Sequence, residues 1–501
     1  MKVISLGMGT KIFEQDSAVR QRMVGYGQIF DELHLIVFTP NLEIYSDQNI
    51  APNVFLYPTK SKIRIFYLFD YIRIASRIIK RIGKRDVLIS AQDPFETGIV
   101  GLLIKFFYRL PLQVQIHTDF INKYFITHSL LNLLRLPLGI FVVSFADSVR
   151  CVSDRIAQSI RSIANNVSVL PILIETGQFT ETKKPKDLDI INILTVSRLE
   201  KEKDLTTAIE AFAKLAEHTN AVYTIVGDGT ERVKLENLCR DLKIENRVVF
   251  VGWQNNLTKY YEEADIYLST SLYEGYGMSV VEAGFAGLAL VLSDAGVANS
   301  VFKNEESAII CRPRDVASFL SALSKLTKEK DLRERMGLLA QKEAKKHLVE
   351  KGEYLSGYKD SFLRAKDFYR EGGIFKKNIL LRYVVAGLTG AGTQIGLLYI
   401  FTDLLKVWYI YSSVIAFVSA IVVSFLLQKF WTFKDKATDN IHHQAFKYLI
   451  TAVSGLLINT VLMYVLVDLF GLWYILAQII IGAVIMIFNF LMYKLFVFHK
   501  K

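Results

Sequence analysis

Two glutamates, Glu274 and Glu282, lie eight positions apart in the stretch SLYEGYGMSVVEAG, on either side of a Gly-Tyr-Gly turn. The stretch follows an apolar run of strand length, so we expect a loop that carries Glu274 and then a helix that begins near Ser279. Gly275 and Gly277 would let the backbone approach a ligand closely. The free N–H groups and the dipole of the helix start suit a diphosphate, and Glu282 in the first turn could accept hydrogen bonds from two ribose hydroxyls.

Ser279 and Glu282 also match a capping box, in which two side chains satisfy the free N–H groups of a helix start without any ligand. This stretch alone does not decide between the two interpretations. Two cations, Arg198 and Lys203 of the stretch SRLEKEKD, favour the ligand, because they follow another strand and would lie at the same edge of the sheet. A guanidinium forks onto phosphate oxygens, and an ammonium adds a compact positive charge. With the turn VGDG, which contains Gly227, these residues indicate a site for one nucleotide diphosphate.

Short apolar runs alternate with stretches of helical spacing over the first 370 residues or so. Such alternation predicts βαβ units and parallel sheets. A polar stretch at residues 181–189 interrupts the series, so we expect an α/β fold with two doubly wound, Rossmann-like domains. The predicted domains are residues 1–182, completed by a helix at 350–370, and residues 190–348. Sheets of this kind bind ligands at the carboxyl ends of their strands, here in a cleft between the domains.

The ordered set SRLEKEKD, VGDG and E-x7-E resembles the retaining glycosyltransferases of family four, whose fold is of the GT-B type. The resemblance spans about residues 1–370 and is strongest in the second predicted domain. It implies that Arg198 and Lys203 neutralise the departing diphosphate. It also implies that Glu282 holds the ribose and that Glu274 contacts sugar hydroxyls near the reacting carbon. The full donor-binding set is then Arg198, Lys203, Gly227, Gly277, Met278, Ser279 and Glu282.

In the first predicted domain, the resemblance places the family's histidine at His117 of QIHTDF, with Asp119 beside it. His117 would hydrogen-bond the transferred sugar, whereas ordinary packing is the equal alternative for a histidine there. Gly9 and Asp119 would lie near the acceptor. Two departures from the family's pattern lie where acceptor and sugar would meet. The first turn is Gly7-Met-Gly9 instead of a Gly-Gly pair, and Pro171 leads into ILIET instead of Asn-Gly.

No metal ion or other cofactor is expected, and the nucleotide-diphosphate sugar is expected to be a substrate. Retention without an evident enzyme nucleophile suggests substitution on one face, in which the leaving phosphate helps to deprotonate the acceptor. The sequence Asp187-Leu-Asp189 has the form of the DxD metal motif of the other large transferase fold. Because it falls in the predicted linker, we interpret it as solvated charge. The cysteines, Cys151, Cys239 and Cys311, are scattered and predict free thiols rather than a zinc site.

Four apolar runs lie in the last quarter of the chain, at residues 383–402, 407–428, 448–467 and 469–493. Each is about twenty residues or longer, enough to cross the hydrocarbon core of a bilayer as a helix. We therefore predict a domain of four transmembrane helices at residues 376–501, with buried helices of a large core as the alternative. Lysines and arginines gather at both ends of this segment and between the second and third runs. This pattern predicts a multi-pass protein of the cell membrane with cytoplasmic catalytic domains and termini.

The membrane segment contains an internal repeat. Residues 382–390, RYVVAGLTG, match residues 447–455, KYLITAVSG, and the same offset aligns KFWTF with KLFVF. With two spans in each unit, the copies should be related by an axis along the membrane normal. The four spans resemble the GtrA-like family, which implies the handling of polyprenyl-phosphate sugars. Four polar residues within the spans could form interhelical hydrogen bonds or line a path for a lipid head group; they are Gln394, Asn459, Gln478 and Asn489.

The net charge of +11 is accompanied by no nucleic-acid motif, so it suggests contact with anionic lipid rather than with nucleic acid. Residues 60–85 interleave basic and apolar side chains. That composition suits either an interfacial helix on lipid or an amphipathic helix packed on the first sheet. Residues 136–146 are apolar but short, and they predict a buried element rather than a fifth span.

The function that these features predict is a membrane-bound retaining glycosyltransferase. It would move a sugar from a nucleotide sugar to a polyprenyl-phosphate or lipid-linked glycan, in cell-surface polysaccharide or glycolipid assembly. One alternative is a transporter that flips polyprenyl-phosphate sugars and has a regulatory or loading domain. Another is a sugar-nucleotide epimerase, which can share the fold but has soluble substrates. Intact cationic and acidic residues favour catalysis, and the expected partners are the nucleotide sugar, the lipid acceptor and the membrane. The membrane domain could also support a homo-oligomer.

Overall fold

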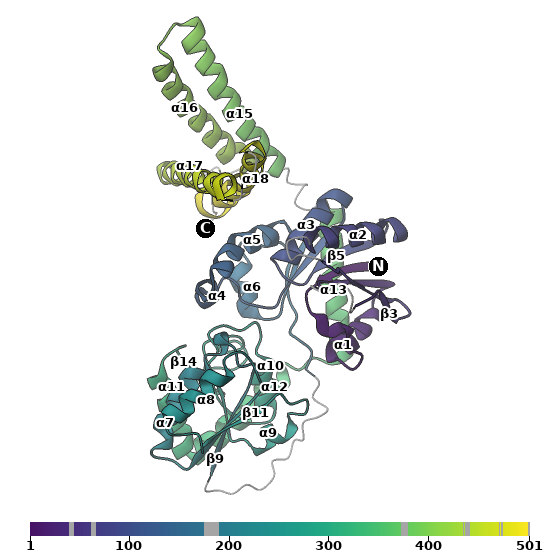
Figure 1. The fold of residues 1–501 in the computed structure, drawn as a ribbon, viewed down its shortest axis with the longest axis vertical. Coiled ribbons are helices and arrows are strands. Elements are labelled where there is room, and N and C mark those ends of the chain that lie inside the picture. The colour runs from purple at the N-terminus through teal and green to yellow at the C-terminus, as the bar shows by residue number, and fades with distance from the viewer. Residues whose placement is uncertain are drawn as a thin grey trace. The chain divides into compact units, whose positions relative to one another are not determined.

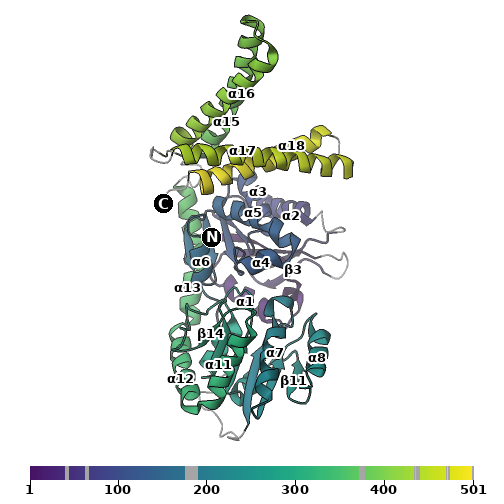
Figure 2. The same ribbon diagram turned by 90° about the vertical axis from the view of Figure 1, so that its left-hand side faces the viewer.

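The structure is a computed structural model that describes residues 1–39, 45–61, 67–174, 190–371, 379–433, 435, 441–469, 471 and 474–498. Its contacts divide it into two compact units, Met1–Lys366 and Asp367–Lys501. Figure 1 and Figure 2 show the helices and strands of the two units. The linker predicted at residues 181–189, with Asp187 and Asp189, lies outside the described residues.

The N-terminal part of the first unit is built on a sheet of eight described strands (Figure 1). They are β1 (Lys2–Gly7), β2 (Glu32–Val37), β3 (Gln48–Ala51), β4 (Val54–Pro58), β5 (Val87–Ala91), β6 (Leu112–Ile116), β7 (Ser148–Cys151) and β8 (Val167–Val169). Their order is β3-β4-β2-β1-β5-β6-β7-β8, and only β3 runs antiparallel to its neighbour. The central strands are apolar because helices cover both faces of a parallel sheet. Those helices are η1 (Thr10–Phe13), α1 (Ala18–Gly27), α2 (Tyr67–Ile82), α3 (Glu96–Tyr108), α4 (Lys123–His128), α5 (Leu130–Phe145) and α6 (Asp154–Ile160).

A second sheet of six described strands follows. Its strands are β9 (Ile191–Val196), β10 (Ala221–Val226), β11 (Val248–Gly252), β12 (Ile266–Ser269), β13 (Ala289–Ser293) and β14 (Ile309–Cys311). All run parallel, in the order β11-β10-β9-β12-β13-β14. The helices around it are η3 (Lys201–Lys203), α7 (Leu205–Ala216), α8 (Arg232–Asp241), α9 (Thr258–Glu263), α10 (Met278–Phe285), α11 (Val316–Lys328) and α12 (Lys330–Lys346).

Each sheet has one point at which the strand order reverses. In the second sheet, the chain passes from β9 to β10 on one side, whereas β12 pairs with β9 on the other side. In the first sheet the reversal lies between β1 and β5. Loops that leave the carboxyl ends of two such strands diverge, and ligands bind there in open α/β sheets. The two doubly wound sheets confirm the predicted α/β fold and direct attention to the loops after β9 and β12.

The helix α13 (Lys351–Arg370) follows the second sheet in sequence but packs against the first. Its Tyr354, Tyr358 and Phe362 are buried in the core of the first sheet. Ser361 Oγ accepts a hydrogen bond of 2.7 Å from the side chain of Gln113 on β6. We call the first sheet with its helices and α13 the first lobe, and the second sheet with its helices the second lobe.

A buried arginine, Arg150 on β7, holds the two chain segments that connect the lobes. Its Nη2 group contacts the carbonyl oxygens of Leu170 (2.9 Å) and Pro171 (3.3 Å), where the chain leaves the first lobe. The same group contacts the Tyr354 hydroxyl (3.1 Å), where the chain returns. The two connecting segments also line one small pocket. Both connections therefore start from the same place on the first lobe.

Most apolar side chains of α2 face the first sheet, and Tyr71, Ile74 and Ile78 among them are buried, whereas Phe69 is exposed. For its described residues, the packed amphipathic helix is therefore the correct alternative at residues 60–85, of which 62–66 lie outside the described part. Of the segment 136–146, predicted to be buried, residues 142–146 are buried, whereas Pro137 is exposed; the first turn of α5 is also exposed at Leu130.

The second unit consists of long apolar helices, each followed directly by a π-helical turn. The helices are α15 (Ile379–Tyr399), α16 (Tyr409–Leu426), α17 (Ile441–Met463) and α18 (Tyr474–Met492), and the turns are η4 (Ile400–Leu404), η5 (Leu427–Thr432), η6 (Tyr464–Leu469) and η7 (Tyr493–Val497). Within the described residues, three stretches are long and apolar enough to cross a membrane: Val385–Leu404, Val414–Thr432 and Ile441–Leu469. The presence of a fourth span stays a prediction.

Contacts repeat between the two halves of this unit at the offset seen in the sequence. Arg382, at the start of the first hairpin, donates a hydrogen bond of 3.3 Å to the carbonyl oxygen of Trp431 at its end. Lys447 donates one of 3.2 Å to the carbonyl oxygen of Phe496 at the same positions of the second hairpin. Each cation also lies over the ring of its partner. The repeat in sequence is therefore a repeat in helix contacts.

The polar residues of the spans have different surroundings. Gln394 is exposed, whereas Asn489 Oδ1 is buried and has no hydrogen-bond partner among the described residues. Asn459 is partly buried, and the side chain of Gln478 lies outside the described part. The choice between interhelical bonding and a head-group path stays open for these residues.

Candidate functional site

The loops after β9 and β12 are fixed against each other by backbone contacts. The amide of Leu272 donates to the carbonyl oxygen of Glu202 at 2.8 Å. The Thr270 hydroxyl lies 2.9 and 3.0 Å from the carbonyl oxygens of Lys203 and Asp204. These bonds hold η3, which carries the predicted cation Lys203, beside the loop that carries Glu274.

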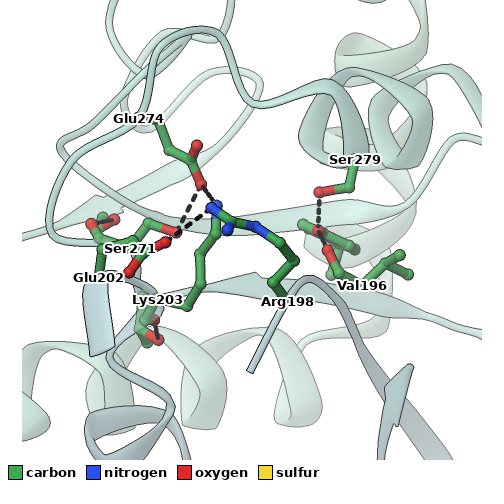
Figure 3. Close-up of polar contacts among 10 residues, drawn as sticks. Val196, Arg198, Glu202, Lys203, Ser271, Glu274 and Ser279 are labelled. Carbon is green, nitrogen blue, oxygen red and sulfur yellow. Dashed lines mark hydrogen bonds and ion pairs between the residues drawn. The ribbon is translucent and has the colours of Figure 1, made fainter. Parts of the chain in front are cut away.

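Lys203 and Glu274 form an ion pair at this point (Figure 3). Ser271 Oγ donates a hydrogen bond of 2.9 Å to the same carboxylate. The other predicted cation, Arg198, pairs with Glu202 at 2.8 Å. The first pair is largely buried, with 14% and 19% of the two side chains exposed, whereas Arg198 is 64% exposed. In the ligand-free protein, each predicted cation is therefore already balanced by a carboxylate.

The helix α10 begins at Met278, and its N-cap is Gly277 in a left-handed conformation (φ +94°). No side chain caps this helix, so the capping box proposed for Ser279 and Glu282 is not formed. Ser279 Oγ instead accepts a hydrogen bond of 2.8 Å from the hydroxyl of Tyr267. Figure 3 labels Ser279 and draws the hydrogen bond at its hydroxyl as a dashed line. The first turn of α10 therefore has no side chain that satisfies its N–H groups.

Glu282, one turn into α10, is held by a buried tyrosine. The Tyr261 hydroxyl donates a hydrogen bond of 2.8 Å to Glu282 Oε2. Burial raises the pKa of Glu282, and the bond from Tyr261 lowers it by a smaller amount. The buried Tyr261 hydroxyl thus fixes the orientation of the Glu282 carboxyl group on the helix that follows β12.

The VGDG turn packs directly on the loop after β9. Gly227 has φ +138°, and a Cβ atom there would lie 1.9 Å from the carbonyl oxygen of Ser197. The amide of Leu199 donates to the carbonyl oxygen of Asp228 at 2.9 Å. A glycine is therefore required at position 227 for packing, and its predicted contact with the donor stays a prediction.

The loop of Glu274 also touches the first lobe. A Cβ atom on Gly275 would lie 1.8 Å from the carbonyl oxygen of His117, at the carboxyl end of β6. The structure thus brings His117 next to the Glu274 loop. The residue His117 is partly open to solvent. The protein around its imidazole lowers the pKa of His117 by desolvation, and the charges of Arg150 and Arg22 lower it further. His117 is therefore neutral at pH 7.

Asp119, two residues farther on, is almost fully buried, with 6% exposed. Its Oδ1 atom has no hydrogen-bond partner among the described residues. Burial raises the pKa of Asp119, and the charge of Arg155 lowers it. Arg155 itself crosses to the second lobe, where it pairs with Asp294 at 2.5 Å. The carboxyl group of Asp119 thus lies at the border between the lobes.

Gly9 behaves differently from the other predicted glycines. Its φ of −87° suits any residue, and a Cβ atom there would meet nothing within 4 Å. The backbone therefore gives no reason for glycine at this position, and its place near the acceptor stays a prediction.

Several side chains of this site were not predicted from the sequence. Tyr261 and Tyr267 lie on α9 and β12 and show no motif, because their role depends on the packing of α10. Ser271 could have been found, since it precedes Glu274 by three residues in the same loop. The ion pair of Arg155 with Asp294 joins the two lobes and has no local signal.

Within the described residues, no group of three or more His, Cys, Asp or Glu side chains could hold a metal ion. Asp187 and Asp189 lie outside the described part, so the expected absence of a metal requirement stays a prediction. The three cysteines are buried free thiols.

Two family models match the chain. The model described as Glycosyl transferases group 1 matches residues 178–343, and the GtrA/DPMS transmembrane domain matches residues 382–498. The first match contains all of the loops after β9 and β12, and the second covers the repeated hairpins.

Among curated relatives, an uncharacterised glycosyltransferase of Methanocaldococcus jannaschii is 34% identical over 28% of this chain and 37% of its own length. The Escherichia coli UDP-Gal:alpha-D-GlcNAc-diphosphoundecaprenol alpha-1,3-galactosyltransferase is 30% identical over 27% of this chain and 36% of its own length. The matched part thus spans little more than a third of these relatives.

Solved structures extend the likeness to both lobes. The sucrose-phosphate synthase of Thermosynechococcus elongatus aligns with 74% of this chain and 99% of its own, with a TM-score of 0.60 and 17% identity. At that identity the likeness concerns the fold, which is of the GT-B type. The first unit therefore has a fold of the GT-B type, residues 178–343 match the model of group 1 glycosyl transferases, and residues 382–498 match the GtrA/DPMS transmembrane domain, in agreement with both resemblances found in the sequence.

Proposed function

We propose that this protein is a membrane-bound retaining glycosyltransferase that transfers a sugar from a nucleotide diphosphate to a lipid-linked acceptor at the cytoplasmic face of the cell membrane. One observation carries the proposal. Arg198 and Lys203 lie in the loop after β9, which hydrogen bonds fix against the loop after β12 that leads into the uncapped start of α10. Two cations beside the free N–H groups of a helix start form a diphosphate site.

The donor would bind with its diphosphate between these cations and the first turn of α10. Glu282, oriented by the hydroxyl of Tyr261, would accept hydrogen bonds from the ribose. Met278 and Ser279 would offer their backbone N–H groups to the phosphate oxygens. Arg198 and Lys203 would stabilise the negative charge that grows on the diphosphate as the glycosidic bond stretches.

The transferred sugar would lie between the Glu274 loop and His117. Glu274 would contact its hydroxyls, and neutral His117 would donate or accept one further hydrogen bond. In the reaction, the bond from the anomeric carbon to the phosphate oxygen breaks and a bond to the acceptor oxygen forms on the same face. For a glycan acceptor, the leaving phosphate takes the proton of the acceptor hydroxyl; a polyprenyl-phosphate would attack through an ionised phosphate oxygen, with no proton to remove. Asp119, whose Oδ1 atom has no described partner, would face the acceptor side.

The acceptor is proposed to be a polyprenyl-phosphate or a lipid-linked glycan. The Escherichia coli relative is named for action on a sugar attached to diphosphoundecaprenol. The GtrA/DPMS transmembrane domain supports membrane residence, and the flanking positive charges support cytoplasmic lobes and four spans. In this arrangement the membrane domain presents the lipid to the lobes.

The test is transfer by the purified full-length protein of labelled sugar from nucleotide sugars to extracted membrane lipids. Labelled lipid supports the proposal. An altered free nucleotide sugar would indicate an epimerase instead, and the absence of both products would leave a transporter.

Arg198→Ala and Lys203→Ala should each lower turnover by about a hundredfold or more, the usual effect of removing a preorganised charge partner. The matched control is Lys201→Ala, an exposed lysine on the same η3 segment, which should keep its activity.

A further inference from the structure

A second loop of the second lobe packs against the loop that carries Glu274. It comprises residues 294–299, directly after β13, and is called the β13 loop. The last residue of β13, Ser293, donates a hydrogen bond of 2.5 Å to the carbonyl oxygen of Ser271. Ser271 in turn donates to the carboxylate of Glu274 (Figure 3). The start of the β13 loop is therefore connected to the glutamate that is proposed to contact the sugar.

The β13 loop also contacts the backbone on the other side of Glu274. Gly296 has φ +57°, and a Cβ atom there would lie 2.5 Å from the carbonyl oxygen of Tyr276 and 2.9 Å from Cβ of Glu274. A side chain at position 296 would displace the Glu274 loop, because backbone atoms already fill that space. The position of the β13 loop therefore determines the position of Glu274.

An arginine of the first lobe holds the β13 loop. Arg155 Nη2 lies 2.5 Å from Asp294 Oδ1 and donates a hydrogen bond of 2.9 Å to the carbonyl oxygen of Ala298. Its Nη1 atom lies 3.3 Å from the carbonyl oxygen of Asp294. Asn299 Nδ2 donates a further bond of 3.1 Å to the same carboxylate oxygen. One guanidinium thus contacts both ends of the loop, which a planar group with several donors can do.

The helix that carries Arg155 is anchored in the first lobe. Arg155 is the second residue of α6, and Ile156, Ala157 and Ile160 of this helix are buried. The start of α6 also faces the Glu274 loop, since burial and, to a smaller extent, the charge of Asp154 raise the pKa of Tyr276 to about 12. The arginine therefore extends from a fixed base toward both loops of the second lobe.

A purely stabilising ion pair is the simpler explanation for Arg155. Exposed ion pairs contribute little to stability on their own. The side chain of Arg155, however, is only 26% exposed, and two of its acceptors are backbone carbonyl oxygens. Contacts with the backbone fix the position of a loop, whereas a contact with a carboxylate alone would mainly balance charge.

We propose that Arg155 is a positioning residue for sugar transfer, which holds the β13 loop and thereby fixes Glu274 opposite His117. The inference rests on the proposed transferase function and adds a residue to it. Glu274 and His117 belong to different lobes, so a contact between the lobes must set the distance between them. Arg198 and Lys203, by contrast, both lie in the second lobe. Loss of Arg155 should therefore disturb the reacting groups and leave nucleotide binding intact.

The first test measures turnover and nucleotide affinity of the full-length protein. Arg155→Ala should lower turnover in the transfer of labelled sugar by about 10- to 100-fold, the usual cost of misplacing reacting groups by about 1 Å. Its affinity for UDP and GDP, measured by calorimetry, should equal that of the wild type. Arg161→Ala, at the exposed other end of α6, is the matched control and should keep full turnover. The melting temperature of each variant verifies that it is folded.

Two further variants separate position from charge. Arg155→Lys keeps the charge but lacks the planar fork, so it should remain slower than the wild type. The double variant Arg155→Ala/Asp294→Ala should be no slower than Arg155→Ala, because both changes remove the same contact. Full turnover in Arg155→Lys would show that charge alone matters, and this result would overturn the proposal. Slow turnover together with weakened binding of both nucleotides would mean a general disturbance of the second lobe and would also overturn it.

Hydrogen exchange of the ligand-free protein tests the same contact without any activity. The β13 loop contains backbone hydrogen bonds, such as that from Val301 N to the carbonyl oxygen of Val297 at 2.9 Å. In Arg155→Ala, the amides of residues 272–278 and 294–302 should exchange faster, whereas those of α7 should not change. Unchanged exchange in both segments would overturn the proposal. A wild-type protein without transfer activity would refute the proposed function instead, and the exchange rates would then decide alone whether Arg155 holds the Glu274 loop.

Discussion

The substitution Glu274→Gln should change two quantities in opposite directions: the affinity for a nucleoside diphosphate and the rate of sugar transfer. In the ligand-free protein, Glu274 neutralises Lys203 and accepts a hydrogen bond from Ser271. Glutamine keeps an oxygen for both partners but removes the negative charge. We therefore expect the variant to bind a nucleoside diphosphate more tightly and to transfer sugar more slowly, because Glu274 is proposed to contact the sugar.

The magnitude follows from the geometry of the pair. An anion that contacts Lys203 Nζ opposite Glu274 would lie two hydrogen-bond lengths, about 5–6 Å, from the carboxylate. At that separation two unit charges repel by about 3 kcal/mol at an effective dielectric constant of 20, and by about 0.7 kcal/mol in bulk water. Because 14% of Lys203 and 19% of Glu274 are exposed, we expect a value between these limits. A relief of about 1–2 kcal/mol corresponds to binding that is about 5- to 30-fold tighter.

Calorimetric titration of UDP and GDP into the purified protein measures the first effect, and transfer of labelled sugar measures the second. Turnover should fall by about a hundredfold. Glu217→Gln is the control, since Glu217 is an exposed carboxylate at the end of α7, away from the pair. Unchanged or weaker binding of both nucleotides by a folded Glu274→Gln protein would refute the electrostatic account of this site.

Three further outcomes are expected. Transfer should be fully retained in EDTA; a loss that only a divalent ion restores would point to a metal-dependent reaction. Glu282→Gln should raise the melting temperature of the ligand-free protein at pH 7 but not near pH 4. Burial raises the pKa of Glu282 in the folded protein above its ordinary 4.5. Between these two pKa values the folded protein binds a proton that the unfolded chain has lost, so the free energy of unfolding falls as the pH rises through this range. A melting temperature that differs from that of the wild type by the same amount at both pH values would contradict this. Gly275→Ala should lower turnover at least about tenfold, because the added Cβ atom would collide with the backbone of His117. Gly9→Ala, where a Cβ atom meets nothing, should leave turnover unchanged. Equal turnover in the two variants would show that the two lobes need not approach each other at this point.

The sequence was most informative where a function depends on residues near each other in the chain. The alternation of buried strands and helices predicts two parallel sheets, because each strand must be apolar on both faces. The loop after β9 and the start of α10 were located for the same reason: a strand, a glycine turn and a helix follow one another locally. The glycine N-cap of α10 excludes the capping box of Ser279 and Glu282, whereas the diphosphate site at this helix start stays a prediction.

What the sequence could not predict depends on distant contacts. Lys203 and Glu274 are 71 positions apart, and nothing in either stretch indicates that one neutralises the other. The approach of Gly275 to His117 depends on the orientation of two lobes. For α2, an amphipathic pattern fits a sheet and a lipid surface equally well, and only the neighbouring elements decide which side is covered.

The position of Arg150 has a consequence for how the two lobes can move. Since both chain crossings depart beside this guanidinium, any opening of the molecule must pivot there, and the ends of the sheets far from the pivot would travel most. Such a joint allows rotation while opposing translation, so the Glu274 loop would return to the same spot on the first lobe at every cycle.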